Sequence, residues 1–248
     1  MSIYIALHKQ CDLPDLEHYI PIQVGAALHP KLGYLADDEG NNISEKNANF
    51  CELTALYYIW KNTDDTPVGL VHYRRFFYQK KYRSDEKQIV KYQTFCNIVN
   101  EETVVLPQKH YFRRNNYEQY SMLHQKKDMD LCRSVIYDFS PEYDEAFQAV
   151  MAQKYIYPYN MFVMTRKNFE HYMEWLFTIL FRMEKLCDLS DYDAYNQRIF
   201  GFLSERLLNV WVMKNNLKIV SFPVYNNTET IGKHLMEELE NGIKKIMR

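Results

Sequence analysis

Residues 68–75 constrain the fold of this chain more than any other segment. They read Val-Gly-Leu-Val-His-Tyr-Arg-Arg, a short apolar run that ends in an imidazole, a phenol and two guanidinium groups. Such a run is typical of a buried strand in an open α/β sheet, whose carboxyl end opens into a crevice. Two adjacent guanidinium groups match phosphate oxygens in geometry and charge. The run predicts either an anion site or a strand that ends in solvated charges, and its spacing favours the two equally.

Length and composition favour a single α/β domain. The 248 residues are 47% hydrophobic and carry a net charge of −2, which gives no general attraction to nucleic acid. The five cysteines are scattered without a CxxC pair, so neither a disulfide framework nor a zinc site is indicated. The first residues lack a signal-peptide pattern, and no apolar run is long enough to span a bilayer. We therefore expect a cytoplasmic protein with reduced cysteines.

Hydrophobic periodicity predicts alternating strands and helices. The expected strands cover residues 3–7, 19–24, 68–71, 103–107 and 217–222. The expected helices cover residues 49–62, 130–135, 141–151, 167–187 and 191–215. Residues 34–49 form a polar loop, and residues 111–127 are expected to form a mobile lid or an acceptor-facing loop. A further strand begins after the aromatic segment 155–160. This pattern predicts a mostly parallel central sheet flanked by helices.

Two helices carry charged residues that need an explanation. Asn49 and Glu52 have the spacing of a capping box, so Glu52 is expected to serve the start of its helix. In the later helix, Arg198, Glu205 and Arg206 stand among apolar neighbours, where charges are normally paired. A buried salt bridge and a functional carboxylate are equally good interpretations of Glu205.

The last residues form an amphipathic helix in which the apolar residues share one side. These are Ile231, Leu235, Leu239, Ile243 and Ile246. The helix could pack on the domain, form an oligomer, or lie on an anionic membrane surface. We expect packing on the domain. The organisation predicted is one domain over residues 1–229, followed by an amphipathic helix over residues 230–248.

Several phosphate-binding and catalytic motifs are absent from the sequence. It contains no Walker A, GxGxxG, HExxH or GxSxG pattern, and its seven glycines make a glycine-cradled phosphate site improbable. Anion binding would have to come from side chains such as Arg74 and Arg75. A GT-A type glycosyltransferase has an Asp-x-Asp at the end of a similarly placed strand, where this chain has His72-Tyr73-Arg74. The Asp-x-Asp patterns at residues 128–130 and 191–193 do not follow a strand, so both are weak.

Four segments together resemble one family. They are Glu-Leu-Thr-Ala-Leu-Tyr at 52–57, Gly-Leu-Val-His-Tyr-Arg-Arg-Phe-Phe at 69–77, Tyr-Asn-Met-Phe at 159–162, and Gly-Phe-Leu-Ser-Glu-Arg-Leu-Leu at 201–208. The chain resembles, over residues 3–224, a bacterial family of capsule and O-antigen gene clusters that was long described only as a domain of unknown function. Its members are regarded as glycosyltransferases. The resemblance implies a single GT-A-like α/β domain that moves a hexose, with galactose-type favoured, from a UDP-linked donor to a saccharide acceptor.

Combined with the residues, this resemblance gives each candidate a role. Arg74 and Arg75 would neutralise the leaving diphosphate, and Glu205 would act as the general base. The residues expected to hold the nucleotide are His8, Lys9, Asp38 and Asn47. The residues expected to face the sugar or the acceptor are Tyr157, Tyr159, Asn160 and Arg198. His72 is a candidate phosphate donor or metal ligand, and a divalent cation (Mn²⁺ or Mg²⁺) is a candidate cofactor.

The expected partners are a nucleotide-sugar donor and a lipid-linked or oligosaccharide acceptor, without nucleic acid. Peripheral association with the cytoplasmic face of the inner membrane stays open. Two other classes of protein also fit the residues. One is a noncatalytic carbohydrate- or nucleotide-binding module that uses its aromatic residues as stacking platforms. The other is a phosphoesterase that uses His72 and the arginines.

Overall fold

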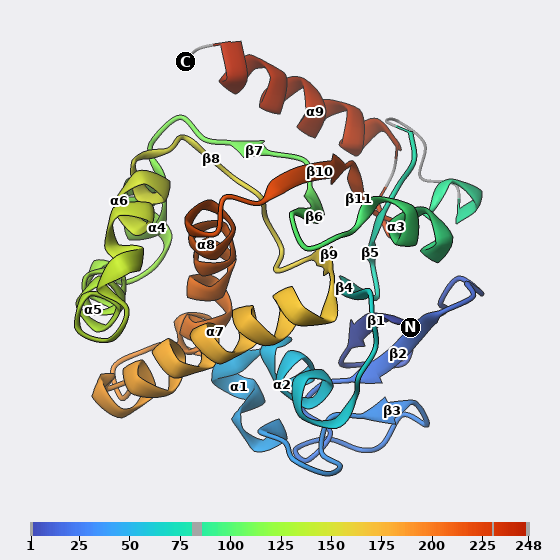
Figure 1. Ribbon diagram of the computed structural model, residues 1–248, viewed down its shortest axis with the longest axis horizontal. Helices are drawn as coiled ribbons and strands as arrows, with labels where there is room; N and C mark the ends of the chain where they lie inside the picture. The colour runs from blue at the N-terminus through green and yellow to red at the C-terminus, as the bar shows by residue number, and fades with distance from the viewer. Residues whose placement is uncertain (1, 81–85, 230, 247–248) are drawn as a thin grey trace.

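A twisted central sheet organises the molecule (Figure 1). The computed structural model describes residues 2–80, 86–229 and 231–246. The main strands lie in the order β10-β6-β9-β4-β1-β2-β3. Their bounds are β1 Ser2–Leu7, β2 Tyr19–Gln23, β3 Leu35–Ala36, β4 Val68–His72, β6 Thr103–Pro107, β9 Phe162–Met164 and β10 Lys218–Phe222. Neighbouring strands are parallel except that β9 runs against both β4 and β6. The expected mostly parallel α/β sheet is confirmed.

Two smaller strand pairs extend this framework. β5 (Arg75–Phe77) folds back on β4 and pairs with β11 (Val224–Asn226). β7 (His110–Tyr111) and β8 (Tyr155–Ile156) form a separate two-stranded sheet. The five strands expected from the sequence are all present within two residues of their expected bounds, because each combines an apolar run with clear turn residues.

Helices cover both faces of the sheet. Their bounds are α1 Asn47–Phe50, α2 Leu53–Asn62, α3 Tyr92–Ile98, α4 Asn116–Leu123, α5 Lys126–Phe139, α6 Asp144–Ala152, α7 Arg166–Leu186, α8 Ile199–Lys214 and α9 Ile231–Ile246. Short 3₁₀ turns cover Ser44–Lys46, Glu86–Gln88, Pro141–Tyr143 and Asn196–Arg198. The helix expected over residues 167–187 is confirmed as α7, which buries a stripe of apolar residues.

Alternate residues of β1 face two different hydrophobic cores. Tyr4 and Ala6 belong to the larger core, which contains the buried faces of α2, α7 and α8. Ile3 and Ile5 belong to the smaller core beside α3 and β5. Because side chains alternate across a strand, β1 must be apolar on both faces, as strands of parallel sheets usually are. A strand buried in this way fixes the position of whatever follows its carboxyl end.

Two local expectations were wrong. Residues 111–127 do not form a lid, because α4 lies within them and begins with a capping box between Asn115 and Glu118. The capping box expected at Asn49 and Glu52 is absent. Cys51 adopts a positive φ of 52° and separates α1 from α2, so these two residues do not share a helix start.

The tail forms the expected helix, α9, but its apolar side does not pack on the domain. Leu235, Leu239, Ile243 and Ile246 are all exposed, whereas the polar residue Asn241 contacts the neighbouring β7 strand. The expected contact of the helix with the domain is therefore present, but the polar side of α9 makes it. Among the described residues, no helix combines the length and apolar character needed to cross a bilayer. Whether α9 constitutes a unit separate from residues 1–229 stays a prediction.

Candidate functional site

A cavity of about 680 Å³ lies at the carboxyl ends of β1 and β4. This is where an open α/β sheet is expected to bind a ligand, and the volume is in the usual range for small-molecule sites. Its polar lining residues are His8, Asn47, Cys51, Glu52, His72, Tyr73, Arg74, Arg75, Tyr159, Gln197, Arg198 and Glu205. Eight of the twelve residues proposed from the sequence therefore line one cavity. Glu52 joins them unexpectedly.

The end of β4 is a tight hairpin. His72 pairs with Arg75, so Tyr73 and Arg74 form the turn between β4 and β5. The backbone N–H of Tyr73 donates to the carbonyl of Ala6 in β1 at 3.1 Å, which ties the turn to the adjacent strand. The backbone N–H of Asn227 donates to the carbonyl of Arg74 at 3.0 Å. Both arginines thus project from a turn that is held on both sides.

Aromatic rings flank the cationic groups of the cavity. The Arg74 guanidinium lies 5.7 Å from the centroid of the Tyr73 ring, and that of Arg75 lies 4.7 Å from the centroid of the Tyr159 ring. Such contacts hold a guanidinium against the face of an aromatic ring. Arg198 adds a third cation from the start of α8, where its Nε donates to Cys51 Sγ at 3.3 Å. The cavity can therefore attract a multiply charged anion.

Both histidines of the cavity are held in their neutral form. Burial is the main cause that lowers the pKa of His72, and the nearby arginines lower it further against the opposing effect of Glu52. Burial likewise lowers the pKa of His8, with further lowering from Lys9 and Arg74. Nε2 of His72 lies 2.7 Å from the carbonyl oxygen of Tyr159, so this nitrogen carries the proton and donates it. At neutral pH the cationic charge of the cavity comes from the arginines.

Glu205 faces the cavity from α8 and keeps 27% of its side chain exposed. Burial raises its pKa, while Arg206 opposes that effect. The Glu205–Arg206 pair is separated by 3.5 Å. The Arg206 guanidinium instead donates to the carbonyl of Phe202 at 2.9 Å and to Gln119 Oε1 at 2.6 Å. Because Arg206 has these other partners, Glu205 remains directed at the cavity and fits the properties of a general base.

Glu52 is the cavity residue that sequence reasoning assigned to a different role. Its Oε1 accepts a hydrogen bond of 2.7 Å from Asn160 Nδ2, and the same amide also donates to the carbonyl of Gly201 at 3.2 Å. Asn160 is itself buried and has a positive φ of 53°. It therefore lies behind Glu52, linking α2 to α8, and does not line the cavity as expected. The sequence signal for this link was an amide that follows Tyr157 and Tyr159.

The helix break at Cys51 explains how Glu52 reaches the cavity. Gly201 of α8 lies so close that a Cβ atom at this position would be 3.1 Å from Cys51 Sγ. The glycine lets α8 approach the break between α1 and α2 closely. Glu52 and Glu205 are thereby brought to the same cavity from different helices.

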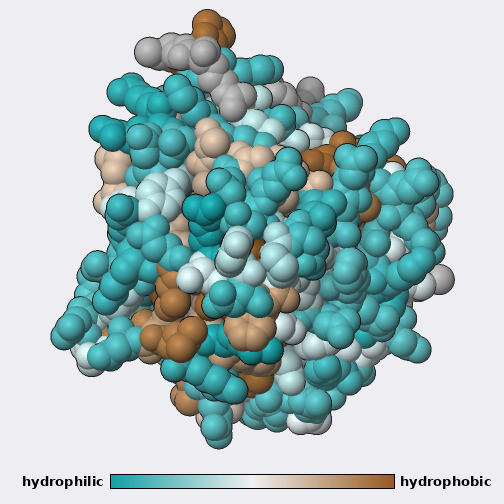
Figure 2. Space-filling view, turned by 60° about the vertical axis from the view of Figure 1, so that its left-hand side comes forward, coloured by the Kyte–Doolittle hydropathy of each residue, from teal (hydrophilic) through white to brown (hydrophobic). Residues whose placement is uncertain are grey.

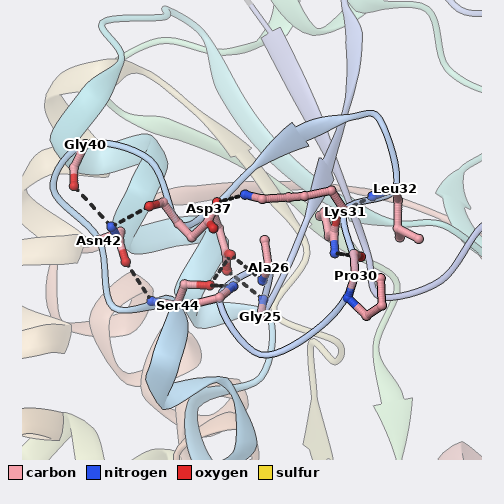
Figure 3. Close-up of polar contacts among 12 residues, drawn as sticks. Gly25, Ala26, Pro30, Lys31, Leu32, Asp37, Gly40, Asn42 and Ser44 are labelled. Atoms are coloured by element: carbon pink, nitrogen blue, oxygen red, sulfur yellow. Dashed lines mark hydrogen bonds and ion pairs between the residues drawn. The ribbon is translucent and has the colours of Figure 1, made fainter.

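The polar loop before α1 contributes less to the cavity than expected. Asp37 is fully buried, and its carboxylate accepts from the backbone N–H groups of Gly25 and Ala26 at 2.9 and 3.0 Å (Figure 3). The Ser44 hydroxyl donates to it at 2.5 Å. Asp38 instead forms an ion pair with Lys31 and does not line the cavity. This network shapes the loop so that Asn47 lines the cavity.

Three more predicted residues lie outside the cavity lining. Lys9 is exposed beside it, with Nζ 5.6 Å from the centroid of the Tyr73 ring. Asp38 is the ion-paired loop residue described above. Tyr157 lies behind α8, where its backbone N–H donates to Asn209 Oδ1 at 2.9 Å. With Asn160, these are the four candidates that the fold does not bring to the cavity surface.

A divalent cation in the cavity stays a prediction. Within the described residues, no three His, Cys, Asp or Glu side chains gather closely enough to hold an ion. His72, the candidate ligand, uses Nε2 in its contact with Tyr159. Asp128 of the first Asp-x-Asp pattern lies in α5, where it accepts hydrogen bonds from Tyr120 and Tyr192. We therefore assign no metal ligands.

The chain is similar in fold and in sequence to known proteins. A solved apo structure of the bifunctional glycosyltransferase WbbM is similar, with 30% sequence identity and a TM-score of 0.84. The similarity covers 90% of this chain and 44% of the WbbM chain, so the chain spans less than half of that protein. A search of curated proteins found no significant match. Residues 2–216 match the family described as "Domain of unknown function (DUF4422)", which covers most of the chain. The chain therefore belongs to the DUF4422 family.

Proposed function

We propose that the protein is a glycosyltransferase that uses a nucleotide diphosphate sugar. The observation that carries the proposal is the placement of Arg74, Arg75 and Glu205 around one cavity at the carboxyl ends of β1 and β4. A transferase of this class needs cations for a leaving diphosphate and a base for an acceptor hydroxyl. The similarity to the glycosyltransferase WbbM supports the same activity.

The proposed reaction is a displacement at the anomeric carbon of the donor. The acceptor hydroxyl oxygen bonds to that carbon while the bond from carbon to the diphosphate oxygen breaks, releasing a nucleoside diphosphate. In an inverting reaction, Glu205 takes the proton of the hydroxyl. Arg74, with Arg75 beside it, neutralises the negative charge that grows on the leaving group. Because this charge is largest in the transition state, fixed cations there lower the barrier.

The remaining cavity residues suggest how the substrates are oriented. His8 and Asn47 lie where β1 and the polar loop meet, and we assign them to the nucleotide. Tyr159 and Arg198 also line the cavity, and we assign them to the sugar or acceptor. Glu52 is a second carboxylate in the cavity, fixed by Asn160, and we assign it to the sugar hydroxyls. Carboxylates accept hydrogen bonds strongly from hydroxyl groups.

For the substrates we propose a UDP-linked hexose, tested first with galactose, and a lipid-linked or oligosaccharide acceptor. Capsule, exopolysaccharide or O-antigen synthesis would be the setting. The experiment incubates the full chain with a panel of UDP- and GDP-sugars and measures release of nucleoside diphosphate. We expect slow hydrolysis of one donor even without an acceptor. Binding without turnover would instead indicate a noncatalytic module, and cleavage of generic phosphate esters would indicate a phosphoesterase.

The arginine cations also give an expectation for metal removal. Since the cavity carries fixed cations and we assign no metal ligands, donor hydrolysis should persist in EDTA. The rate is measured before and after chelation, and then with added Mn²⁺ or Mg²⁺. A loss of turnover that either ion restores would show that the divalent cation is required and that the arginines do not suffice.

A further inference from the structure

The last helix, α9, faces the rest of the protein with its polar side. Asn241 Nδ2 donates to the carbonyl of Lys109 at 2.9 Å, and its Oδ1 accepts from the backbone N–H of Tyr111 at 2.6 Å. Glu237 and Glu238 line a small crevice between α9 and the domain. An amphipathic helix that packs on a core normally does the reverse. The polar attachment leaves the apolar side available for another contact.

That apolar side is open to solvent. The exposed fractions are 41% for Leu235, 65% for Met236, 67% for Leu239, 55% for Ile243 and 85% for Ile246. α9 lies at the outer edge of the molecule in Figure 1, and apolar side chains protrude at the same end in Figure 2. A row of exposed apolar side chains on one helix is a typical sign of an interaction surface.

The charges of α9 indicate what covers this surface. Of its acidic residues, Glu237 and Glu238 line the crevice, and Glu240 pairs with Lys244 in the same helix. Lys245 is exposed, and no acidic partner is found for it in the described part of the chain. The helix has strongly separated apolar and polar sides with little net hydrophobicity, the combination typical of helices that lie flat in a membrane interface. The last turn of α9 thus carries one lysine, Lys245, whose charge no acidic side chain balances among the described residues.

We propose that α9 binds the surface of an anionic phospholipid membrane through Leu235, Met236, Leu239, Ile243 and Ile246. These side chains enter the boundary of the acyl chains, while Lys245 contacts lipid phosphates. The attachment also places the candidate active site near the bilayer, because Tyr159 lines both the crevice under α9 and the cavity. If the proposed glycosyl transfer holds, this position suits a lipid-linked acceptor.

The test measures binding of the full chain to vesicles by flotation. Vesicles contain either phosphatidylcholine alone or equal parts phosphatidylcholine and phosphatidylglycerol. The variant Met236→Glu with Leu239→Glu is compared with a control, Met122→Glu with Leu123→Glu. The control residues lie at the end of α4 and are 66% and 55% exposed, so both variants add two charges at comparable exposure. Neither pair touches the cavity.

We expect the wild-type chain and the control to float with the anionic vesicles. The α9 variant should lose at least about tenfold in partitioning, because two apolar side chains are removed from the interface. Absence of wild-type binding, or equal binding by all three proteins, would overturn the proposal. So would a wild-type dimer that becomes monomeric in the α9 variant without vesicle binding, since a second copy would then cover the surface.

Vesicle binding is measured without donor, so it tests α9 independently of the proposed reaction. Donor hydrolysis in solution is measured for the same three proteins. We expect equal rates, which also shows that the variants are folded. A protein that binds vesicles but hydrolyses no donor would contradict the proposed function and leave the membrane surface supported.

Discussion

At the scale of single residues, the cavity differs from the sequence prediction mainly because Glu52 lines it beside Glu205. Glu52 and Glu205 reach it from α2 and α8, and three arginines balance them. The two carboxylates differ in their fixed partners. Glu52 accepts from the Asn160 amide at 2.7 Å, whereas Arg206, the cation beside Glu205, has its shorter contacts elsewhere. We therefore propose proton transfer for Glu205 and positioning for Glu52.

Arg74→Ala tests the diphosphate role directly. Removing a fixed cation from the leaving group should lower kcat for donor hydrolysis by about 10²–10³-fold. Circular dichroism and thermal unfolding should match the wild type, because Arg74 lies in a turn and is only partly buried. Arg133→Ala serves as the control, since Arg133 pairs with Asp144 on the surface and does not line the cavity. Near-normal turnover in Arg74→Ala would contradict the assignment.

Glu205→Gln separates a catalytic from a structural role. It should abolish transfer while donor binding is kept. Burial raises the pKa of Glu205, so the folded state favours the protonated carboxyl, and this contribution to stability is lost as the pH rises through that pKa. Glutamine never ionises, so the variant should be at least as stable as the wild type at pH 7. Its advantage should shrink as the pH falls toward 4.5, the ordinary value for this carboxyl.

The same shift predicts the pH dependence of the wild-type reaction. The acid limb of kcat/KM should lie above pH 4.5, because Glu205 binds its proton more readily than an exposed glutamate does. The rate is measured across the acid range with circular dichroism as a check on folding. A variant Glu205→Gln that unfolds at neutral pH would identify Glu205 as a structural residue and remove the basis of this prediction.

At the scale of elements, the polar loop before α1 is a structural support for the cavity. Asp37 is fully buried and binds two backbone N–H groups and a hydroxyl, whereas Asp38 forms one ion pair with Lys31. Asp37 is fully buried and Asp38 is partly exposed, although the two are the same residue type and adjacent in the sequence. A sequence search for ligand-binding carboxylates could not have separated them.

Asp37→Asn and Asp38→Asn form a matched pair. In Asp37→Asn, the amide oxygen is a weaker acceptor for the backbone N–H groups, or the amide N–H faces one of these donors. The variant should therefore lower the free energy of unfolding by about 1–3 kcal/mol. The second removes a partly exposed ion pair and should change it by less than about 1 kcal/mol. Denaturant unfolding measures both. Equal effects would show that the Asp37 network does not hold the loop.

At the scale of the whole molecule, β9 joins the two halves of the sheet. It runs antiparallel to both β4 and β6, and its residue Val163 pairs with Gly69 of β4 and with Val105 of β6. A Cβ atom at Gly69 would be 2.7 Å from the carbonyl oxygen of Phe162 and 2.8 Å from Ile3 Cδ1. Glycine is required here by the space between strands, because its neighbours include backbone that cannot move aside.

Gly69→Ala should therefore destabilise the whole fold by about 1–3 kcal/mol through overpacking. Gly242→Ala in α9 is the matched control, since no atom lies within 4 Å of a Cβ atom there. Alanine is the better helix former by about 1 kcal/mol, so this second change should be neutral or stabilising. The denaturant midpoints of both variants are compared with that of the wild type. An unchanged midpoint for Gly69→Ala would contradict the close contact between the strands.

The sequence alone determined most of the fold, because local patterns carry the necessary information. Apolar runs located the strands, 3.6-residue periodicity located α7, and the change from apolar to cationic residues at Arg74 located the cavity. The helix break at Cys51 was missed, since a positive φ at a cysteine leaves no mark in composition or periodicity. The capping pattern of Asn49 and Glu52 was present without the structure that it usually accompanies.

Only the tertiary structure decided which polar residues share the cavity. Glu52 and Glu205 are separated by most of the chain, and the close passage of α8 past Cys51 brings them together. The same holds for Asp37, Asn160 and Tyr157, which packing directs away from the cavity. The orientation of α9 likewise depends on two hydrogen bonds of Asn241, one donated to Lys109 and one accepted from Tyr111. Hydrophobic patterns specify which residues are buried together, whereas the direction of a polar side chain depends on neighbours distant in sequence.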